Sequence, residues 1–192
     1  MARTKEFNFD DKLKVARDLF WEQGYHTTSL NDLVKKLQLN RSSIYESYGS
    51  KHNLFILCLK DYISLKQKSY LKSAAKSTSP IKAVETIIRD IVDTILLDTR
   101  TCLAVNSTFE LGRVDKDAAK LLKYQAEKSV KLFEDLLKKA QKKGEIAQNR
   151  DPEILAYFIV SNFASLWNAE ILFSDKKRLK QLTDFLINSV IN

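Results

Sequence analysis

Residues that interrupt helices are scarce in this chain. Its 192 residues include only four Gly and two Pro, whereas average usage is about 7% Gly and about 5% Pro. The alternation of apolar and polar residues that is typical of strands is also absent. Because Leu and Lys are abundant and apolar residues recur at helical spacing, the sequence predicts an all-α fold.

Cysteines and long apolar runs are few as well. The two cysteines, Cys58 and Cys102, set no disulfide framework, which fits reduced thiols. The chain shows no apolar N-terminal segment of the kind that directs secretion, and no uncharged apolar run approaches the roughly 18 residues of a transmembrane helix. We therefore expect a cytoplasmic protein without a membrane partner.

Signatures of catalysis are missing from the sequence. It holds no nucleophile–base pair, no Gly-rich phosphate loop and no acidic metal motif. The two histidines, His26 and His52, are not spaced with cysteines or carboxylates as metal ligands are. We expect His26 in a loop and His52 at a helix start, where it could touch a phosphate. The sequence thus predicts no enzyme, no cofactor and no metal site.

Positive charge is concentrated in one quarter of the chain. The net charge of +8 arises within residues 35–82, which carry ten Lys/Arg and two Asp/Glu, while residues 1–34 sum to −1 and residues 83–192 to +1. A compact basic region indicates an anionic partner, either nucleic acid or lipid headgroups. A solvated lysine-rich surface is the alternative that charge alone leaves open.

Helical periodicity and its interruptions predict about nine helices. Gly24, Gly49, Gly112 and Gly144 mark breaks between them, and the segment before Pro80 is the one Ser-rich interruption. Thr28, Asn40 and Ser50 are expected to cap the second, third and fourth helices. The predicted helices span residues 10–23, 29–37, 41–48, 51–73, 81–97, 101–111, 115–143, 152–173 and 175–191.

The stretch "SLNDLVKKLQLNRSSIYESYGSKHNLF", residues 29–55, has the pattern of a helix-turn-helix. Its second helix is too short to be stable alone, so Ile44 and Tyr48 are expected to pack inward. The outward face then carries the small and polar side chains Ser42, Ser43, Tyr45 and Glu46. Such a face fits a major groove. Arg41, in the first turn, can reach a phosphate or a guanine edge, and Lys51 follows the Ser50 cap, where the N–H groups of a helix start favour a phosphate.

These residues resemble the N-terminal DNA-binding domain of TetR-family transcriptional regulators. The similarity covers about residues 10–60, including "WEQGYHTTSLNDL" and "SSIYESYGSKHNL". The resemblance implies DNA contacts from Ser43 and Tyr45, and phosphate contacts from Thr28, Tyr45 and Lys51. It further implies a helix-turn-helix DNA-binding domain, assigned to residues 1–52, followed by a helical ligand-binding and dimerisation domain at residues 53–192. The sequence pattern itself leaves the boundary open, within the fourth helix or near Ser77–Pro80.

Three positions depart from the family pattern. Gln38 stands where Gly is usual in the turn, which predicts either a left-handed non-Gly residue or a different turn. Ser42 replaces a common Gly. Glu46 places a carboxylate near phosphates, which is unfavourable unless it accepts from a cytosine amino group. Glu46 is therefore a hypothesis about operator specificity.

The remainder of the chain is interpreted through the same resemblance. The apolar stripes of the last two helices, beginning near Ile154 and Leu182, are too wide for one-sided burial; a monomer core could bury them, but the resemblance implies a homodimer on a palindromic double-stranded DNA operator. It also implies a cavity for a small, hydrophobic effector that releases the repressor. The residues expected to line this cavity are Tyr62, Asn106, Phe109, Glu110, Tyr124, Phe163 and Trp167.

The two cysteines have different expectations. Cys58 follows Leu54 by four residues on an apolar helix face, which predicts a core position. Cys102 opens a short helix beside Arg100, where a thiolate is favoured. Two alternatives to effector release therefore remain: a redox or electrophile-sensing regulator triggered through Cys102, and a nonspecific nucleic-acid or membrane-surface binder that uses only the basic segment.

Overall fold

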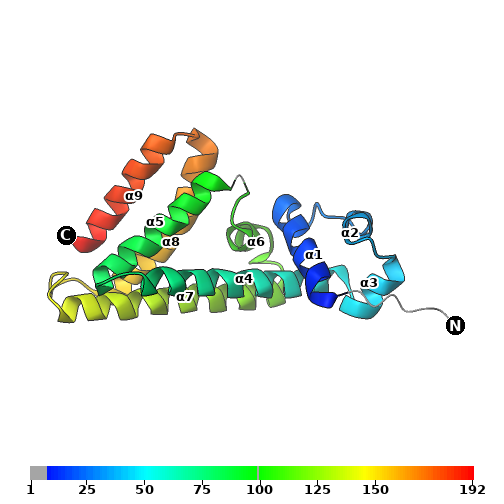
Figure 1. Ribbon diagram of the computed structural model, residues 1–192, viewed down its shortest axis with the longest axis horizontal. Helices are drawn as coiled ribbons and strands as arrows, with labels where there is room; N and C mark the ends of the chain where they lie inside the picture. Colours follow the sequence, from blue (N-terminus) through cyan, green and yellow to red (C-terminus); the bar gives the residue numbers. More distant parts are fainter. Residues whose placement is uncertain (1–7, 99) are drawn as a thin grey trace. The chain divides into compact units, whose positions relative to one another are not determined.

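The computed structural model describes residues 8–98 and 100–192, and these form helices without any strand (Figure 1). The all-α prediction is confirmed, and every predicted helix is present. The observed helices are α1 Phe9–Gln23, α2 Leu30–Leu37, α3 Arg41–Tyr48, α4 Lys51–Ala75, α5 Pro80–Leu97, α6 Leu103–Leu111, α7 Lys116–Lys142, α8 Pro152–Phe173 and α9 Lys176–Ile191.

The main corrections concern helix starts. Ser29, and not Thr28, caps α2: its hydroxyl accepts a hydrogen bond from the backbone N–H of Asp32, whose carboxylate in turn accepts from the N–H of Ser29. This reciprocal capping box satisfies two N–H groups that a helix start leaves free. Helix α6 begins at Leu103 with Cys102 as its N-cap and no side-chain capping bond, two residues later than predicted.

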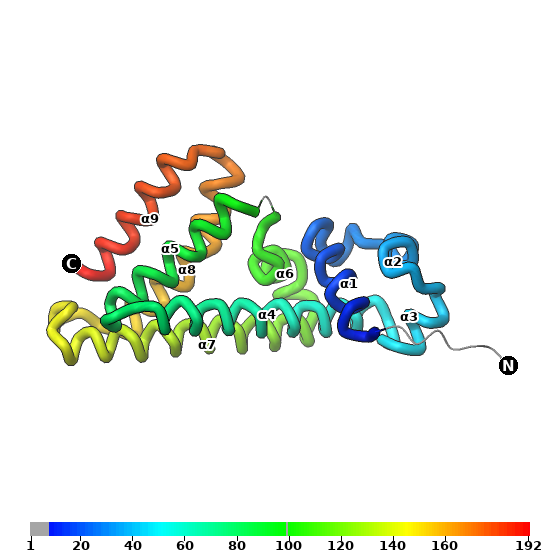
Figure 2. Tube along the Cα trace, viewed as in Figure 1, coloured from blue at the N-terminus to red at the C-terminus, as the bar shows by residue number. Residues whose placement is uncertain are grey.

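The chain forms two compact units. The first contains residues 8–64 and 102–122, and the second contains residues 65–101, apart from residue 99, and residues 123–192. Helices α4 and α7 each contribute to both units, as the continuous traces of Figure 2 show. These units are defined by which residues pack together. The predicted boundary between residues 52 and 53 is the end of a DNA-binding domain, which is a different quantity, and it stays a prediction.

The first unit has a dense aromatic and aliphatic core. Phe20 and Phe55 are fully buried, and their rings meet edge to face with centroids 5.1 Å apart. Ile44 and Tyr48 of α3 are also buried, as predicted. Residues from α6 and the start of α7 complete this core, namely Leu103, Leu111, Ala118 and Leu122.

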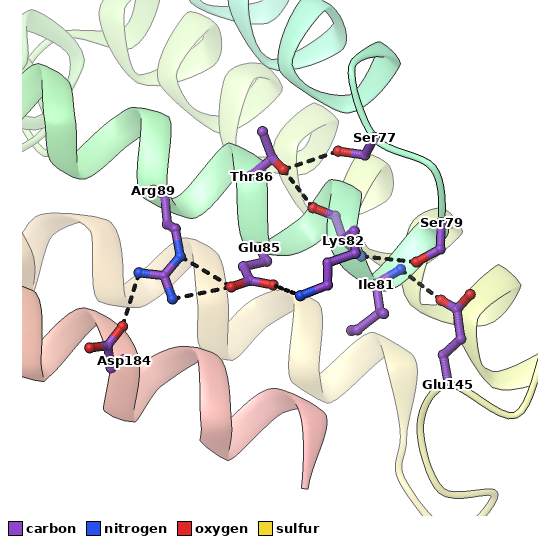
Figure 3. Close-up of polar contacts among 9 residues, drawn as sticks. All are labelled: Ser77, Ser79, Ile81, Lys82, Glu85, Thr86, Arg89, Glu145 and Asp184. Carbon is purple, nitrogen blue, oxygen red and sulfur yellow. Dashed lines mark hydrogen bonds and ion pairs between the residues drawn. The ribbon is translucent and has the colours of Figure 1, made fainter.

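The second unit packs α9 against α5 and α8. Figure 3 shows Arg89 of α5 bonded to Glu85 on its own helix and to Asp184 on α9, with Nη1 and Oδ1 2.9 Å apart. At the start of α5, Glu145 accepts a hydrogen bond from the N–H of Ile81 at 2.9 Å. The hydrogen bond from Lys82 lowers the pKa of Glu85. These polar contacts join α5 to α9 and to the segment that follows α7.

The turn between α2 and α3 uses a non-Gly residue in the left-handed conformation. Gln38 has φ 53° and ψ 39°, so the first of the two predicted alternatives is confirmed. The left-handed conformation costs an L-residue about 1–2 kcal/mol, and the Gln38 side chain is exposed, so it returns little packing energy.

Replacing Gln38 with Gly should therefore stabilise the protein. We expect the free energy of unfolding to rise by about 0.5–1 kcal/mol, because the relief of strain exceeds the added entropy of the unfolded chain; urea denaturation followed by circular dichroism measures it. Ser174→Gly is the matched control for the relief of left-handed strain, since Ser174 has a similar φ of 47° but lies outside the helix-turn-helix. A Gln38→Gly protein that unfolds at lower urea would contradict this account of the turn.

Candidate nucleic-acid interface

Helix α3 is short and is held at both ends. The side chain of Asn40 accepts a hydrogen bond from the N–H of Ser43 at 2.8 Å, and Gly49, with φ 79°, ends the helix by donating to the carbonyl of Tyr45. The hydroxyl of Tyr48 donates to the carbonyl of Phe9 at 3.2 Å, and burial raises the pKa of Tyr48 to about 12. The helix is thus positioned by caps and by its buried face.

The opposite face of α3 is open and polar. Ser42, Tyr45 and Glu46 are exposed, with Tyr45 at 48%, and Ser43 is half-buried. Arg41 is exposed as well, and its Nη2 donates to the side chain of Asn31 on α2 at 2.7 Å. The structure thus brings five of the predicted DNA contacts onto one face, next to the start of α2.

The start of α4 carries Lys51, a further predicted phosphate contact. The hydroxyl of Ser50 accepts a hydrogen bond from the N–H of Asn53 at 3.0 Å, so Ser50 caps α4 as predicted. The Nζ atom of Lys51 lies 4.4 Å from the ring centroid of Tyr25, a cation–π contact. Burial lowers the pKa of Lys51, against the opposing effect of Glu110.

Thr28 lies differently from the predicted phosphate contact. It is fully buried, and its hydroxyl donates to the carbonyl of Gly24 at 2.6 Å. A phosphate contact from the Thr28 hydroxyl requires it to break its hydrogen bond with the carbonyl of Gly24. The predicted phosphate contact stays a prediction. The neighbouring Ser29 is exposed at the start of α2, where hydrogen bonds from Ser29 lower the pKa of Asp32.

Two polar contacts of this unit were not predicted, because their partners are far apart in sequence. The carboxylate of Glu110 accepts hydrogen bonds from the backbone N–H groups of Tyr25 and His26. The Nε2 atom of His52 lies 2.7 Å from Oδ2 of Asp115. Separations of 63–85 residues leave no local sequence signal for either contact.

One group of side chains in the described part of the chain has the composition of a metal site. One ligand atom from each of His52, Asp115 and Asp117 lies within 4.8 Å of the others. Asp115 is, however, already used: its Oδ1 accepts from the N–H of Ala118 at 2.9 Å. That bond and the one to His52 lower the pKa of Asp115. Asp115 therefore caps α7, and its bond to His52 joins this cap to α4. These two roles account for the cluster.

The predicted effector-binding residues fall into both units, and each is described within its own. In the first unit, Tyr62 is buried, Asn106 and Glu110 are half-buried, and Phe109 is 75% exposed. In the second unit, Phe163 and Trp167 are buried, while Tyr124 is 50% exposed. Their role in ligand binding stays a prediction.

A cavity of about 280 Å³ lies in the second unit between α5 and α9. Its lining carries both signs of charge and contains none of the predicted effector-binding residues: it consists of Arg89, Val92, Asp93, Lys180, Thr183 and Asp184. Effector pockets are typically larger and mostly apolar, so this cavity does not fit the expected hydrophobic ligand.

The two thiols differ in environment, as expected. Cys58 is fully buried, which confirms its core position, and burial raises the pKa of its thiol. Cys102 is half-buried, and the hydroxyl of Tyr62 lies within hydrogen-bond distance of its Sγ at 3.3 Å. The guanidinium of Arg100 donates to the carboxylate of Asp98 through two nitrogens. Of the two cysteines, Cys102 is therefore the accessible one.

A capped eight-residue helix with a polar outward face, presented after a left-handed turn, defines a helix-turn-helix DNA-binding protein. The comparisons identify the family. The family model "Bacterial regulatory proteins, tetR family" matches residues 13–58, and the model "Tetracyclin repressor-like, C-terminal domain" matches residues 82–186. The chain belongs to the TetR family, and it is a DNA-binding transcriptional regulator.

Individual relatives agree with this assignment. The chain is 29% identical over 187 residues to the uncharacterized regulator YezE of Bacillus subtilis (strain 168), covering 96% of each protein. It is 30% identical over 164 residues to the repressor ComR of Escherichia coli (strain K12), covering 82% of this chain and 77% of ComR.

A solved structure is similar along nearly the whole chain. It is a cysteine mutant of the TetR family regulator CifR complexed with 26-bp operator DNA, 25% identical with a TM-score of 0.84, and the match covers 97% of this chain and 98% of CifR. A regulator from Chloroflexus aurantiacus shares the fold with a TM-score of 0.87 at 15% identity, over 95% of this chain and 93% of that one.

Proposed function

We propose that the protein is a cytoplasmic, non-enzymatic repressor that binds a palindromic operator as a homodimer and is released by a small hydrophobic effector. The observation that carries the DNA-binding part is the outward face of α3, where Ser42, Tyr45 and Glu46 are exposed opposite the buried Ile44 and Tyr48. The contacts to DNA are assigned to Arg41, Ser42, Ser43, Tyr45, Glu46 and Lys51.

The proposed dimer face lies on α8 and α9. Helix α8 is apolar enough, with a mean hydropathy of 1.2, to meet the length and composition of a membrane span, yet only 33% of that window is buried within the protein. A second copy would cover the large apolar side chains that α8 and α9 expose. They are Ile154, Tyr157, Phe158, Ile171, Leu172, Phe173, Leu182 and Phe185.

In this proposal, effector release is a population shift. The effector binds more tightly to a conformation whose two recognition helices no longer match successive major grooves. The relative ComR is a transcriptional repressor, which supports repression over activation.

Footprinting on DNA that flanks the protein's own coding region tests the proposal. We expect protection of one inverted repeat by the purified dimer. Binding without a protected repeat, and with a steep dependence on salt, would instead identify a nonspecific nucleic-acid binder.

Glu46 is expected to read a base rather than a phosphate. Glu46→Ala should relax the preference for a cytosine at one position of each half-site by about fivefold to a hundredfold, equivalent to about 1–3 kcal/mol. Competition between operators that differ at single positions measures the preference. If the ranking of these operators is unchanged in Glu46→Ala, Glu46 has no role in specificity.

Thiol triggering through Cys102 is a second candidate, favoured by its partial exposure and its contact with Tyr62. Peroxide should then release wild-type protein from its operator and leave Cys102→Ser bound. Equal release of both proteins would exclude Cys102 as the trigger.

A further inference from the structure

The carboxylate of Glu110, near the end of α6, is bonded to the loop between α1 and α2. Its Oε2 accepts from the N–H of Tyr25 at 3.1 Å, and its Oε1 accepts from the N–H of His26 at 2.6 Å. Both oxygens are therefore used by two successive backbone donors. Hydrogen bonds to a charged acceptor are stronger than neutral ones, so this contact holds the loop firmly to α6.

The loop has a backbone shape that admits this carboxylate. Gly24 has φ +82°, and a Cβ atom at this position would lie 3.2 Å from Oε2 of Glu110. The hydroxyl of Thr28 donates to the carbonyl of Gly24 and closes the loop from within. Successive N–H groups in a turn form a concave anion site, and here the anion is a side chain of the same chain.

The same loop contacts α4 through the ring of Tyr25. The ring of Tyr25 lies 4.8 Å from that of Phe55, centroid to centroid, and 4.4 Å from Nζ of Lys51. Its backbone is thus held by Glu110, while its ring packs beside a proposed phosphate contact. Only one residue, Thr27, separates His26 from the buried Thr28, which precedes the N-cap of α2. A displacement of Glu110 would move both the start of α2 and the surroundings of Lys51.

We propose that Glu110 is a positioning residue for operator binding, and not an effector ligand. Its carboxylate keeps the loop, and through it Lys51 and α2, in the arrangement that the operator requires. The proposal rests on the proposed function, since it assumes a specific operator. The apparent Kd for the operator is inversely proportional to the fraction of molecules in the arrangement that binds it. If loss of the carboxylate leaves about one tenth of the molecules in that arrangement, the apparent Kd rises about tenfold.

The test uses the full-length protein and three variants. Glu110→Ala removes the acceptor, whereas Glu110→Gln keeps the size but turns an amide N–H₂ toward one of the two N–H donors. Glu127→Gln is the control, because Glu127 is exposed on α7 and its replacement changes the net charge equally. Three quantities are measured: operator affinity, hydrogen exchange at the amides of Tyr25 and His26, and the midpoint of urea unfolding.

We expect both Glu110 variants to bind the footprinted operator about tenfold more weakly and to exchange the two amides faster, with Glu127→Gln like wild type. Removing one negative charge favours DNA binding in general, so weaker binding by Glu110→Gln is not a charge effect. An unchanged urea midpoint in Glu110→Gln would show that its weaker operator binding arises from lost positioning of the loop and not from lost stability.

Two results would overturn the role of Glu110: operator affinity equal to wild type in Glu110→Ala, or wild-type exchange rates at both amides in that variant. A wild-type protein that protects no inverted repeat would overturn the proposed function itself.

Discussion

Replacing Phe185 with glutamate should convert the dimer to a monomer and weaken operator binding at least about a hundredfold. Phe185 is 70% exposed in one protomer, so the substitution leaves the core of that protomer intact. In a dimer it would bury an unpaired carboxylate, which costs several kcal/mol. A monomer also loses the gain of about 10²–10⁴ that comes from engaging two half-sites at once.

Analytical ultracentrifugation and operator titration measure the two effects. Phe109→Glu is the matched control: Phe109 is 75% exposed but lies on α6, outside the proposed dimer face, so this variant should stay dimeric. A Phe185→Glu protein that sediments as a dimer at micromolar concentration would place the interface elsewhere.

The second large effect concerns stability. Ile44→Ala should lower the free energy of unfolding by about 2–5 kcal/mol, because Ile44 is fully buried and its truncation leaves a cavity. Tyr45, its neighbour on the same short helix, is 48% exposed. Tyr45→Ala should change stability by no more than about 0.5 kcal/mol and weaken operator binding about tenfold or more.

Urea denaturation and operator titration of the same two variants give the comparison. If Tyr45→Ala unfolds as easily as Ile44→Ala, the outward face of α3 is part of the core and not a DNA contact. Tyr45→Phe distinguishes the contribution of the hydroxyl to operator binding from that of the ring, because only a hydrogen bond to phosphate requires the hydroxyl.

The helices were predictable because their signals are local. Caps such as Asn40 and the near-absence of Gly and Pro act within a few residues, so helix ends are correct to within about two residues. The error at the start of α2 arose because Thr28 and Ser29 are both good caps. The deciding feature was Asp32, three residues after Ser29, which completes the reciprocal capping box.

The contacts that unite distant segments could not be predicted in the same way. The bonds from the Glu110 carboxylate to a loop 84 and 85 residues earlier have no local sequence signal, and the predicted role of Glu110 in effector binding is a separate matter that stays a prediction. His52 was judged by its spacing along the chain, which does not reveal Asp115 as its partner. Such pairings depend on packing and not on local propensity. The exposed face of α3 was predictable because helical periodicity alone determines it.

The composition of the first unit's core has a consequence for synthesis on the ribosome. Its helix-turn-helix comes from the beginning of the chain, but Leu103, Leu111, Ala118 and Leu122 belong to the same core. Domains generally fold as units during translation, and this one cannot be completed before Leu122 has left the exit tunnel. Until then the part of this core that Leu103, Leu111, Ala118 and Leu122 complete is missing, and apolar surface stays exposed on the nascent chain.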